Sequence, residues 1–366
     1  MDTNGNIFYE CSPGNFIHCF CSTGKHLIIA ESPIDTPSDI QLHYVSEATP
    51  EKSTIISDNV LIAKYKDVAP RTPIIKNIFI AGSKSIYLVI NLTDGVQVIP
   101  FIAKQNDLGN KNDTIENLKW FIPNVHDSVQ SLDIMTETEE NIDFIVGTTL
   151  GHIYCIRYEI SIQSFILLKS FKKWENITQD SINCVRSHGN EVVIASFDNF
   201  LYSIIDKKCE SHHIDVDISK RLDNVKEHTL VYVDFLKIKK YSTSYMRYYL
   251  VNISNYGCVI YHRTIREQWE TLQLLPRDLN QGEEEFTPLI DCVIVKGSNK
   301  DELMLLCGSE HGKLYIWTYN YRIKELTSTK IHRVSKAGLV HNIILTNDSK
   351  ITCLTNDETS INILYL

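Results

Sequence analysis

Residues 302–318 read ELMLLCGSEHGKLYIWT, and this stretch decides the fold class. An apolar run leads into a short polar turn around Gly312, and a second apolar run rich in aromatic residues follows it. Two strand-forming runs joined by such a turn are the signature of a β-hairpin. The first run is apolar at consecutive positions rather than at alternate ones, which indicates a strand that is covered on both faces.

The same hairpin unit recurs along the chain. Aligned first strands begin with residue 28 and end with residue 352, so seven copies give six intervals that average 324/6 = 54 residues. A period of this length holds four strands with their loops and is too rich in strands for a helical solenoid. The copies are residues 26–45, 86–101, 143–158, 191–206, 248–262, 302–318 and 350–366.

Further candidate strands complete most of these units. One precedes the hairpin, as in residues 128–135, 180–186, 231–238, 289–296 and 339–345, and another follows it, as in residues 164–171, 268–275 and 323–331. Four-stranded sheets that pack face to face between neighbours are the blades of a β-propeller. The last unit offers only three strands before the chain stops. The N-terminal run NIFYEC, residues 6–11, is expected to supply the fourth and to cover the open edge.

These observations predict an all-β protein, a seven-bladed β-propeller closed by pairing of the N-terminal strand with the last blade. The whole chain, residues 1–366, is expected to form one domain. Extra strands hidden in residues 105–117 and 207–228 would make the count eight. The blades are expected at residues 12–66, 72–124, 128–173, 180–217, 229–276, 287–332, and 337–366 with 5–11.

Several of these hairpins resemble those of the WD40-repeat family. Residues 307–317 match its small-Ser-x-x-Gly-x-φ-x-φ-Trp pattern, with weaker copies at residues 147–156 and 195–206. Residues 126–132, HDSVQSL, resemble the His-x-x-x-Val start of a WD40 blade. The resemblance implies a degenerate WD40-like propeller that acts as a scaffold for protein partners. A kelch propeller fits less well, because its Gly-Gly strands are missing.

The chain departs from the WD40 pattern in one respect. It has no Trp-Asp dipeptide, and Trp317-Thr318 is the nearest approach at the corresponding hairpin position. The Asp-His-Ser-Trp network typical of the family is therefore expected to be missing from most blades.

Composition excludes several classes of protein. The 366 residues carry 36 Lys and Arg against 45 Asp and Glu, a net charge of −9, and 43% are hydrophobic. This balance excludes a disordered tail and a basic nucleic-acid arm. The polar N-terminus predicts no export, and apolar runs are too short for a membrane-spanning helix, so we expect a soluble protein without membrane contact. Ten scattered cysteines are expected to stay reduced and to pack as small hydrophobes.

The search for chemistry-bearing motifs favours a protein that is not an enzyme. No zinc-ligand spacing, nucleophile elbow, Walker loop or dinucleotide fingerprint occurs, so no metal, cofactor or small-molecule substrate is expected. His212-His213 lies among Glu210, Asp215 and Asp217, and a solvated outer strand is favoured there over a weak metal site. Phosphoinositide-binding propellers carry Phe-Arg-Arg-Gly, and this chain has no Arg-Arg pair.

Long loops on a rigid scaffold are the best candidates for binding. Residues 46–59, 105–117 and 241–249 are expected to share one face, and residues 32–38, 172–178, 219–228 and 277–287 the other. Aromatic and arginine side chains are enriched at protein hot spots, and an acidic run can dock a basic partner. The candidate partner-binding residues are Tyr241, Tyr245, Arg247, Glu283, Glu284 and Glu285, together with Lys172, Lys173 and Trp174.

The sequence thus predicts a non-catalytic scaffold subunit of a nuclear or cytoplasmic multiprotein complex, with other protein subunits as partners and any nucleic-acid association indirect. Two alternatives stay open. Residues 169–174, KSFKKW, mix lysine with aromatic residues as single-strand binders do, which would suit a subunit associated with RNA or DNA. An enzyme would need an active site assembled from distant loops.

Overall fold

The computed structural model describes residues 6–23, 26–36, 40–46, 60–65, 75–81, 86–101, 119–168, 177–189, 191–205, 208–214, 229–239, 245–253, 257–263, 269–275, 289–334, 340–348, 350–357 and 360–365. Every regular element among these residues is a β-strand. None of them belongs to a helix that could cross a bilayer. The chain divides into two compact units, Asn6–Asn190 with Ile344–Leu366 and Glu191–Ile343.

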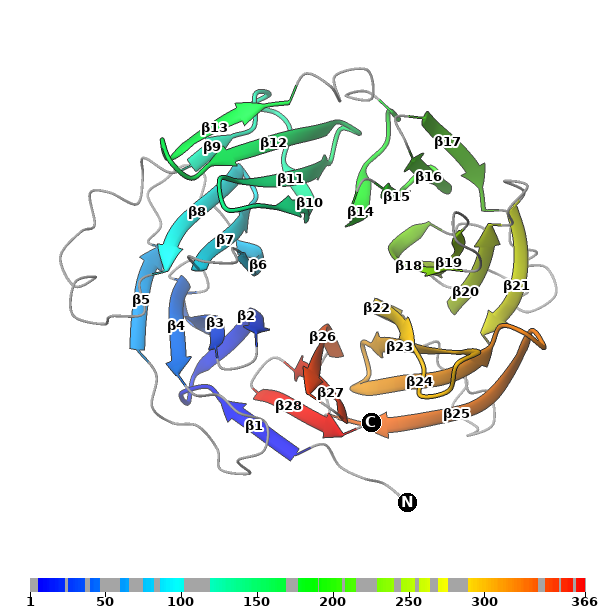
Figure 1. Ribbon diagram of the computed structural model, residues 1–366. Helices are drawn as coiled ribbons and strands as arrows, with labels where there is room; N and C mark the ends of the chain where they lie inside the picture. Colours follow the sequence, from blue (N-terminus) through cyan, green and yellow to red (C-terminus); the bar gives the residue numbers. More distant parts are fainter. Residues whose placement is uncertain are drawn as a thin grey trace. The chain divides into compact units, whose positions relative to one another are not determined.

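The first unit contains three complete four-stranded sheets, whose strands lie side by side in chain order (Figure 1). They are β2 (Asn15–Thr23), β3 (His26–Pro33), β4 (Ile40–Ser46) and β5 (Val60–Tyr65); β6 (Ile75–Ala81), β7 (Ile86–Leu92), β8 (Gly95–Phe101) and β9 (Lys119–Phe121); and β10 (Val129–Glu137), β11 (Asn141–Thr148), β12 (Ile153–Glu159) and β13 (Ser164–Leu167). The same unit holds β14 (Ile182–His188) and a set formed by β1 (Asn6–Glu10), β28 (Ser360–Tyr365) and β27 (Lys350–Asp357).

The second unit contains two complete four-stranded sheets and a three-stranded set. The sheets are β18 (Leu230–Lys239), β19 (Tyr245–Ile253), β20 (Gly257–Arg263) and β21 (Trp269–Leu275), and β22 (Leu289–Lys296), β23 (Glu302–Ser309), β24 (Lys313–Asn320) and β25 (Glu325–Arg333). The set is β15 (Glu191–Ser196), β16 (Phe200–Ile205) and β17 (Lys208–His213). The boundary between the units falls inside β26 (Val340–Asp348). The chain therefore forms seven antiparallel sheets of three or four strands.

The hairpins predicted from the sequence are confirmed. Each of the seven apolar pairs forms two adjacent antiparallel strands, from β3 with β4 to β27 with β28. The pairing of the N-terminal strand with the last hairpin is also confirmed, because β1 lies antiparallel to β28, with Glu10 opposite Ser360 and Asn6 opposite Ile363. The two ends of the chain thus share one set of strands.

One predicted loop is wrong in its position. Residues 241–249 were expected to form a binding loop, but β19 already begins at Tyr245, where it pairs with Lys239 of β18. The pairing continues without a break from there to Asn252 opposite Tyr232. Tyrosine is enriched in strands, and Tyr245, Tyr248 and Tyr249 lie in β19, so the ladder extends into the polar end of the segment.

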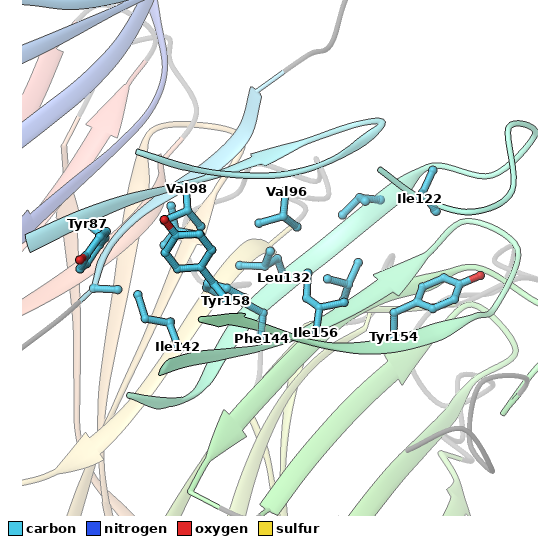
Figure 2. Close-up of a cluster of buried hydrophobic side chains, with 14 residues drawn as sticks. Tyr87, Val96, Val98, Ile122, Leu132, Ile142, Phe144, Tyr154, Ile156 and Tyr158 are labelled. Atoms are coloured by element: carbon cyan, nitrogen blue, oxygen red, sulfur yellow. The ribbon is translucent and has the colours of Figure 1, made fainter. Parts of the chain in front are cut away.

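Both faces of the first hairpin strands are covered, as the consecutive apolar runs predict. In β7, Leu88 and Ile90 pack toward the sheet of β2–β5, whereas Tyr87 and Val89 pack toward the sheet of β10–β13. This alternation follows from the two-residue period of a strand. Figure 2 shows the second of these clusters, in which side chains of β8 meet those of β10, β11 and β12. Facing sheets therefore share one apolar layer.

Buried cysteines belong to these layers. The structure describes the side chains of nine of the ten cysteines; these nine are free thiols, and eight of them are buried. Burial raises the pKa of the Cys19, Cys155 and Cys307 thiols, which keeps them protonated. The expected packing of Cys155, Cys184, Cys258, Cys292 and Cys307 as small hydrophobes is confirmed, and the side chain of Cys353 lies outside the described residues.

Polar side chains on the first strand of one sheet bind the backbone of the first strand of the next. The N–H of Ser187 on β14 donates to Asp133 Oδ2 on β10 at 2.6 Å. In the same way the N–H of Ile294 on β22 donates to Asp234 Oδ2 on β18 at 2.9 Å. The position is equivalent in both sheets, because each Asp lies four residues after the start of its strand. These bonds join sheets whose edges are not paired with each other.

Asp291 makes a similar link in the second unit, and its removal is expected to lower the free energy of unfolding. Its carboxylate, in a residue only 6% exposed, accepts the N–H of Cys292 at 2.8 Å and the N–H of Ile343 at 2.9 Å. Asp291→Ala would leave both buried donors without these acceptors, at a cost of about 2 kcal/mol. Urea denaturation measures this loss. Exposed Glu310→Ala serves as the control, and equal stability of the two variants would contradict the role of the link.

Candidate interaction site around Asp127 and His152

The loop between β9 and β10 meets the turn between β11 and β12 at a buried carboxylate. The Asp127 side chain is fully buried and its Oδ2 lies 2.8 Å from Nδ1 of His152. Its Oδ1 accepts the hydroxyl of Thr149 and the N–H of Leu150, both at 3.0 Å, and the N–H of Ser128 at 2.9 Å. One carboxylate therefore fixes the loop and the turn relative to each other.

These hydrogen bonds determine how Asp127 titrates. Burial raises the pKa of the carboxyl, but hydrogen bonds from His152, Thr148, Thr149 and Leu150 outweigh burial, so the pKa lies below its ordinary value. The group is therefore charged at neutral pH. An ionised carboxylate only accepts hydrogen bonds, so Nδ1 of His152 is the donor in this pair.

The local sequence explains why these residues reach one another. Gly151 has a φ of +80°, which the tight turn before His152 requires. A Cβ atom there would also lie 2.4 Å from the carbonyl oxygen of Thr178, so the turn packs closely on the following segment. The N–H of His152 donates to the Thr148 hydroxyl at 3.0 Å, which closes the turn.

Backbone hydrogen bonds hold the surrounding segments. The N–H of Thr149 donates to the carbonyl of Ser128 at 3.0 Å, and the N–H of Ile122 donates to that of Asp94 at 3.0 Å. The N–H of Val129 donates to the carbonyl of Thr93 at 2.8 Å. The loop before β10 is thus attached to the β7–β8 turn on one side and to the β11–β12 turn on the other.

Large apolar side chains project from these fixed segments. Phe121 is 59% exposed, Val125 63% and Leu150 42%. We call these three side chains, with Asp127 and His152, the Asp127 surface. Exposed apolar side chains on loops that hydrogen bonds fix in place are candidates for an interaction site.

Aromatic rings and an ion pair lie beside the exposed side chains. Ring centroids are 6.0 Å apart for His152 and Tyr154 and 5.6 Å apart for Tyr154 and Trp120. Lys119 Nζ lies 2.6 Å from Asp94 Oδ2 and 4.7 Å from the centroid of the Phe121 ring. Phe121 is therefore supported from one side by a cation whose charge Asp94 balances.

Asp127→Ala is expected to lower the free energy of unfolding by about 2 kcal/mol, because it leaves several buried donors without their acceptor. The pKa of Asp127 is lower in the folded protein than in the unfolded chain, so its stabilisation is full above the unfolded value and is lost as the pH falls through the folded value. Urea denaturation at pH 7 and at about pH 3 tests this expectation. The gap between wild type and variant should narrow at the lower pH, as the pH approaches the folded pKa, whereas exposed Asp180→Ala should open none. A gap that is independent of pH would contradict the argument.

Most residues selected from the sequence lie outside the described residues. These are Lys172, Lys173, Trp174, Tyr241, Glu283, Glu284 and Glu285. Tyr245 and Arg247 are described, and both lie on β19, two residues apart and so on the same face of the strand. Tyr245 is 43% exposed. A partner-binding role for any of these residues stays a prediction.

Arg247 contacts another part of its own unit. Its Nε and Nη2 donate to the two carboxylate oxygens of Glu191 on β15 at 2.7 and 2.6 Å. Lys237 Nζ lies 3.2 Å from the same carboxylate. Burial raises the pKa of Glu191, but the bonds and charges of Arg247 and Lys237 outweigh burial and lower it. Bidentate geometry makes this a strong pair.

The sequence singles out the stretches that hold Asp127, Leu150 and His152, but neither stretch includes Phe121 or Val125, and no local pattern shows that these residues meet. Residues 126–132 and 147–156 were both noted for their resemblance to WD40 blades.

Within the described residues, no group of three or more His, Cys, Asp and Glu is arranged to hold a metal ion. His212 packs edge-on against Tyr261 at 5.7 Å, and Asp215 and Asp217 lie outside the described residues.

Comparison with known proteins supports the architecture. No protein-family model matches the chain, and no curated protein matches its sequence. Two crystal structures of BBS1N in complex with ARL6DN, soaked with lead or mercury, align with all of this chain and 96% of theirs at 12% identity, with TM-scores of 0.54 and 0.53. BBS1N is a β-propeller. The fold is propeller-like.

A designed protein gives a similar result. The computationally designed Ika8 protein aligns over 99% of this chain and 100% of its own length, at 9% identity and a TM-score of 0.50. At such identities the likeness concerns the fold alone. Together with seven antiparallel sheets it supports the all-β, propeller-like prediction.

Proposed function

We propose that this protein is a non-catalytic interaction subunit of a multiprotein complex in the nucleus or cytoplasm. It would be a seven-bladed, WD40-like propeller closed by β1 on the last blade, and it would present fixed loops to protein partners. The observation that carries the proposal is the Asp127 surface, where Phe121, Val125 and Leu150 are exposed on segments held by hydrogen bonds. Rigid loops lose little entropy on binding, which favours affinity.

The likeness to BBS1N supports the same class of role by analogy of fold. That propeller is in complex with ARL6DN, a protein partner. The analogy carries over no partner and no binding residue. The first experiment should therefore test whether the chain binds other proteins.

The test is purification of the tagged full chain from its native cell at moderate salt with nuclease, followed by identification of proteins in stoichiometric yield. Stable partners that survive nuclease support the proposal, and loss of all partners on nuclease treatment would favour the nucleic-acid alternative. Phe121→Ser with Val125→Ser and Leu150→Ser should remove at least one partner. Ile34→Ser with Phe197→Ser and Ile323→Ser, which are equally exposed apolar sites elsewhere, should remove none. A wild-type chain that purifies alone would overturn the proposal.

A further inference from the structure

The edge strand β13 is more apolar than the edge strands β17 (Lys208–His213) and β25 (Glu325–Arg333), and it is longer than the short edge strand β9 (Lys119–Phe121). β17 reads KCESHH and β25 reads ELTSTKIHR, and both are polar, as exposed edges usually are. β13 reads SFIL, with Ile166 42% and Leu167 44% exposed, and Ile162 in the preceding turn is 62% exposed. An apolar open edge invites pairing with another strand.

Within the part of the chain that the structure describes, one side of β13 is not paired with a strand. Among the described strands, only β12 pairs with it. The N–H of Leu168 donates to the carbonyl of Cys155 at 2.8 Å. Because successive residues of an antiparallel strand alternate in direction, Ile166 and Ser164 also face β12, whereas the N–H and C=O groups of Phe165 and Leu167 point away from it.

Negative charge gathers at the start of this edge. Glu159 lies opposite Ser164, and the N–H of Ile160 donates to the carbonyl of Glu140, which brings the β10–β11 turn against the β12–β13 turn. Three exposed glutamates lie at the end of β10 and in the β10–β11 turn: Glu137, Glu139 and Glu140. The apolar edge of β13 thus lies next to a group of glutamates at its Ser164 end.

Arg157, the cation opposite β13 on β12, is paired with a carboxylate. Arg157 lies opposite Ile166 on β12. Its Nε and Nη2 donate to the two oxygens of Asp143 at 2.7 and 2.9 Å. The glutamates therefore set the sign of the charge at the start of β13.

We propose that β13 accepts an extended segment of a partner protein as an added antiparallel strand, with apolar residues along it and Lys or Arg at its C-terminal end. A strand antiparallel to β13 runs toward Ser164, so its last residues reach the glutamates. Backbone pairing would supply affinity, and the charges would supply direction. The inference rests on the proposed interaction function and names the chemistry of one partner segment.

Two synthetic peptides test the inference on the full chain. One alternates threonine and valine and ends in three lysines, and the other is its exact reversal, with the lysines first. Fluorescence anisotropy should show that the lysine-terminated peptide binds about tenfold more tightly, the effect of about one favourable charge contact in a partly desolvated site. High salt should reduce the difference. Equal binding of the two peptides, or no binding of either, would overturn the inference.

Variants separate backbone pairing from side-chain contact. Leu167→Pro removes an outward N–H and should weaken binding about tenfold, whereas Leu167→Ala keeps the N–H and should weaken it about twofold. Glu139→Lys with Glu140→Lys changes exposed side chains only. Glu137 and Glu159 then balance the two new lysines, so the preference between the peptides should disappear even if the proline variant fails to fold. An unchanged preference in that charge-reversed variant would overturn the proposed direction of the added strand.

The same variants distinguish this inference from the proposed function. If the tagged wild-type chain retains partners and the Leu167→Pro chain retains all of them, the inference fails and the proposed function stands. If the wild-type chain retains none, the proposed function fails, and the peptide experiment alone decides the inference. Concentration-dependent dimerisation that Leu167→Pro abolishes would assign the edge to a second copy of the chain and overturn the partner proposal.

Discussion

Gly308→Ala is expected to lower the free energy of unfolding by about 3 kcal/mol. A Cβ atom at Gly308 would lie 1.9 Å from the carbonyl oxygen of Val340 and 2.9 Å from its carbonyl carbon. Both are backbone atoms at the start of β26, and the Val340 side chain is fully buried. The strand is held further by the bond from Ile343 to Asp291. The backbone must therefore shift against a packed layer.

Gly147 provides the matched comparison, because it occupies the corresponding place near the end of β11. A Cβ atom there would meet Ile182 Cγ2 at 2.4 Å and Val185 Cγ1 at 3.0 Å, which are side-chain atoms rather than backbone atoms. We expect Gly147→Ala to cost about half as much as Gly308→Ala. Urea denaturation of both variants, with Glu310→Ala as an exposed control, measures the difference. A Gly308→Ala chain as stable as the control would show that β26 adapts freely.

Arg247→Met is expected to lower the free energy of unfolding by about 3 kcal/mol, because it leaves the Glu191 carboxylate buried without its bidentate partner. The Glu191 side chain is 10% exposed and that of Arg247 20%. Lys237 stays 3.2 Å away, so part of the charge remains balanced and the loss falls at the lower end of the usual range. Lys237→Met removes only the weaker contact and should cost less.

The pH dependence of this loss has a definite sign. The pKa of Glu191 is lower in the folded protein than in the unfolded chain, so its stabilisation is full above the unfolded value and is lost as the pH falls through the folded value. The stability difference between wild type and Arg247→Met should therefore shrink in acid. The double variant Glu191→Gln with Arg247→Met should be more stable than the single variant, because no buried charge remains. A single variant that matches wild type at every pH would contradict this account of Glu191.

Arg247 and Tyr245 are both predicted partner-binding residues, but their substitutions are expected to affect different properties of the protein. Its pair with Glu191 gives it a structural role inside its own unit. Tyr245 lies two residues earlier and is exposed, so its substitution tests partner binding with little effect on folding.

Local sequence patterns predict the hairpins, most of the strands and the pairing of β1 with β28. Strand periodicity and turn residues act over a few positions, so each unit of about 54 residues carries its own signal. Consecutive apolar runs such as residues 87–90 also predicted that both faces are covered, which the two clusters that share β7 confirm. The start of β19 was missed, because its first residues gain their partners from β18 and show no apolar run of their own.

Which polar groups meet depends on how the sheets pack against one another. Glu191 and Arg247 are 56 residues apart in the sequence. Asp127, in the loop before β10, and His152, in the turn before β12, are 25 residues apart. Such pairs depend on the register of neighbouring strands and on the depth at which each side chain lies. A shift of one residue turns a side chain to the opposite face, and no local pattern fixes that register between separate sheets. The hairpins can therefore be predicted from the sequence. The Asp127 surface and the ion pair of Glu191 with Arg247 depend on how the sheets pack.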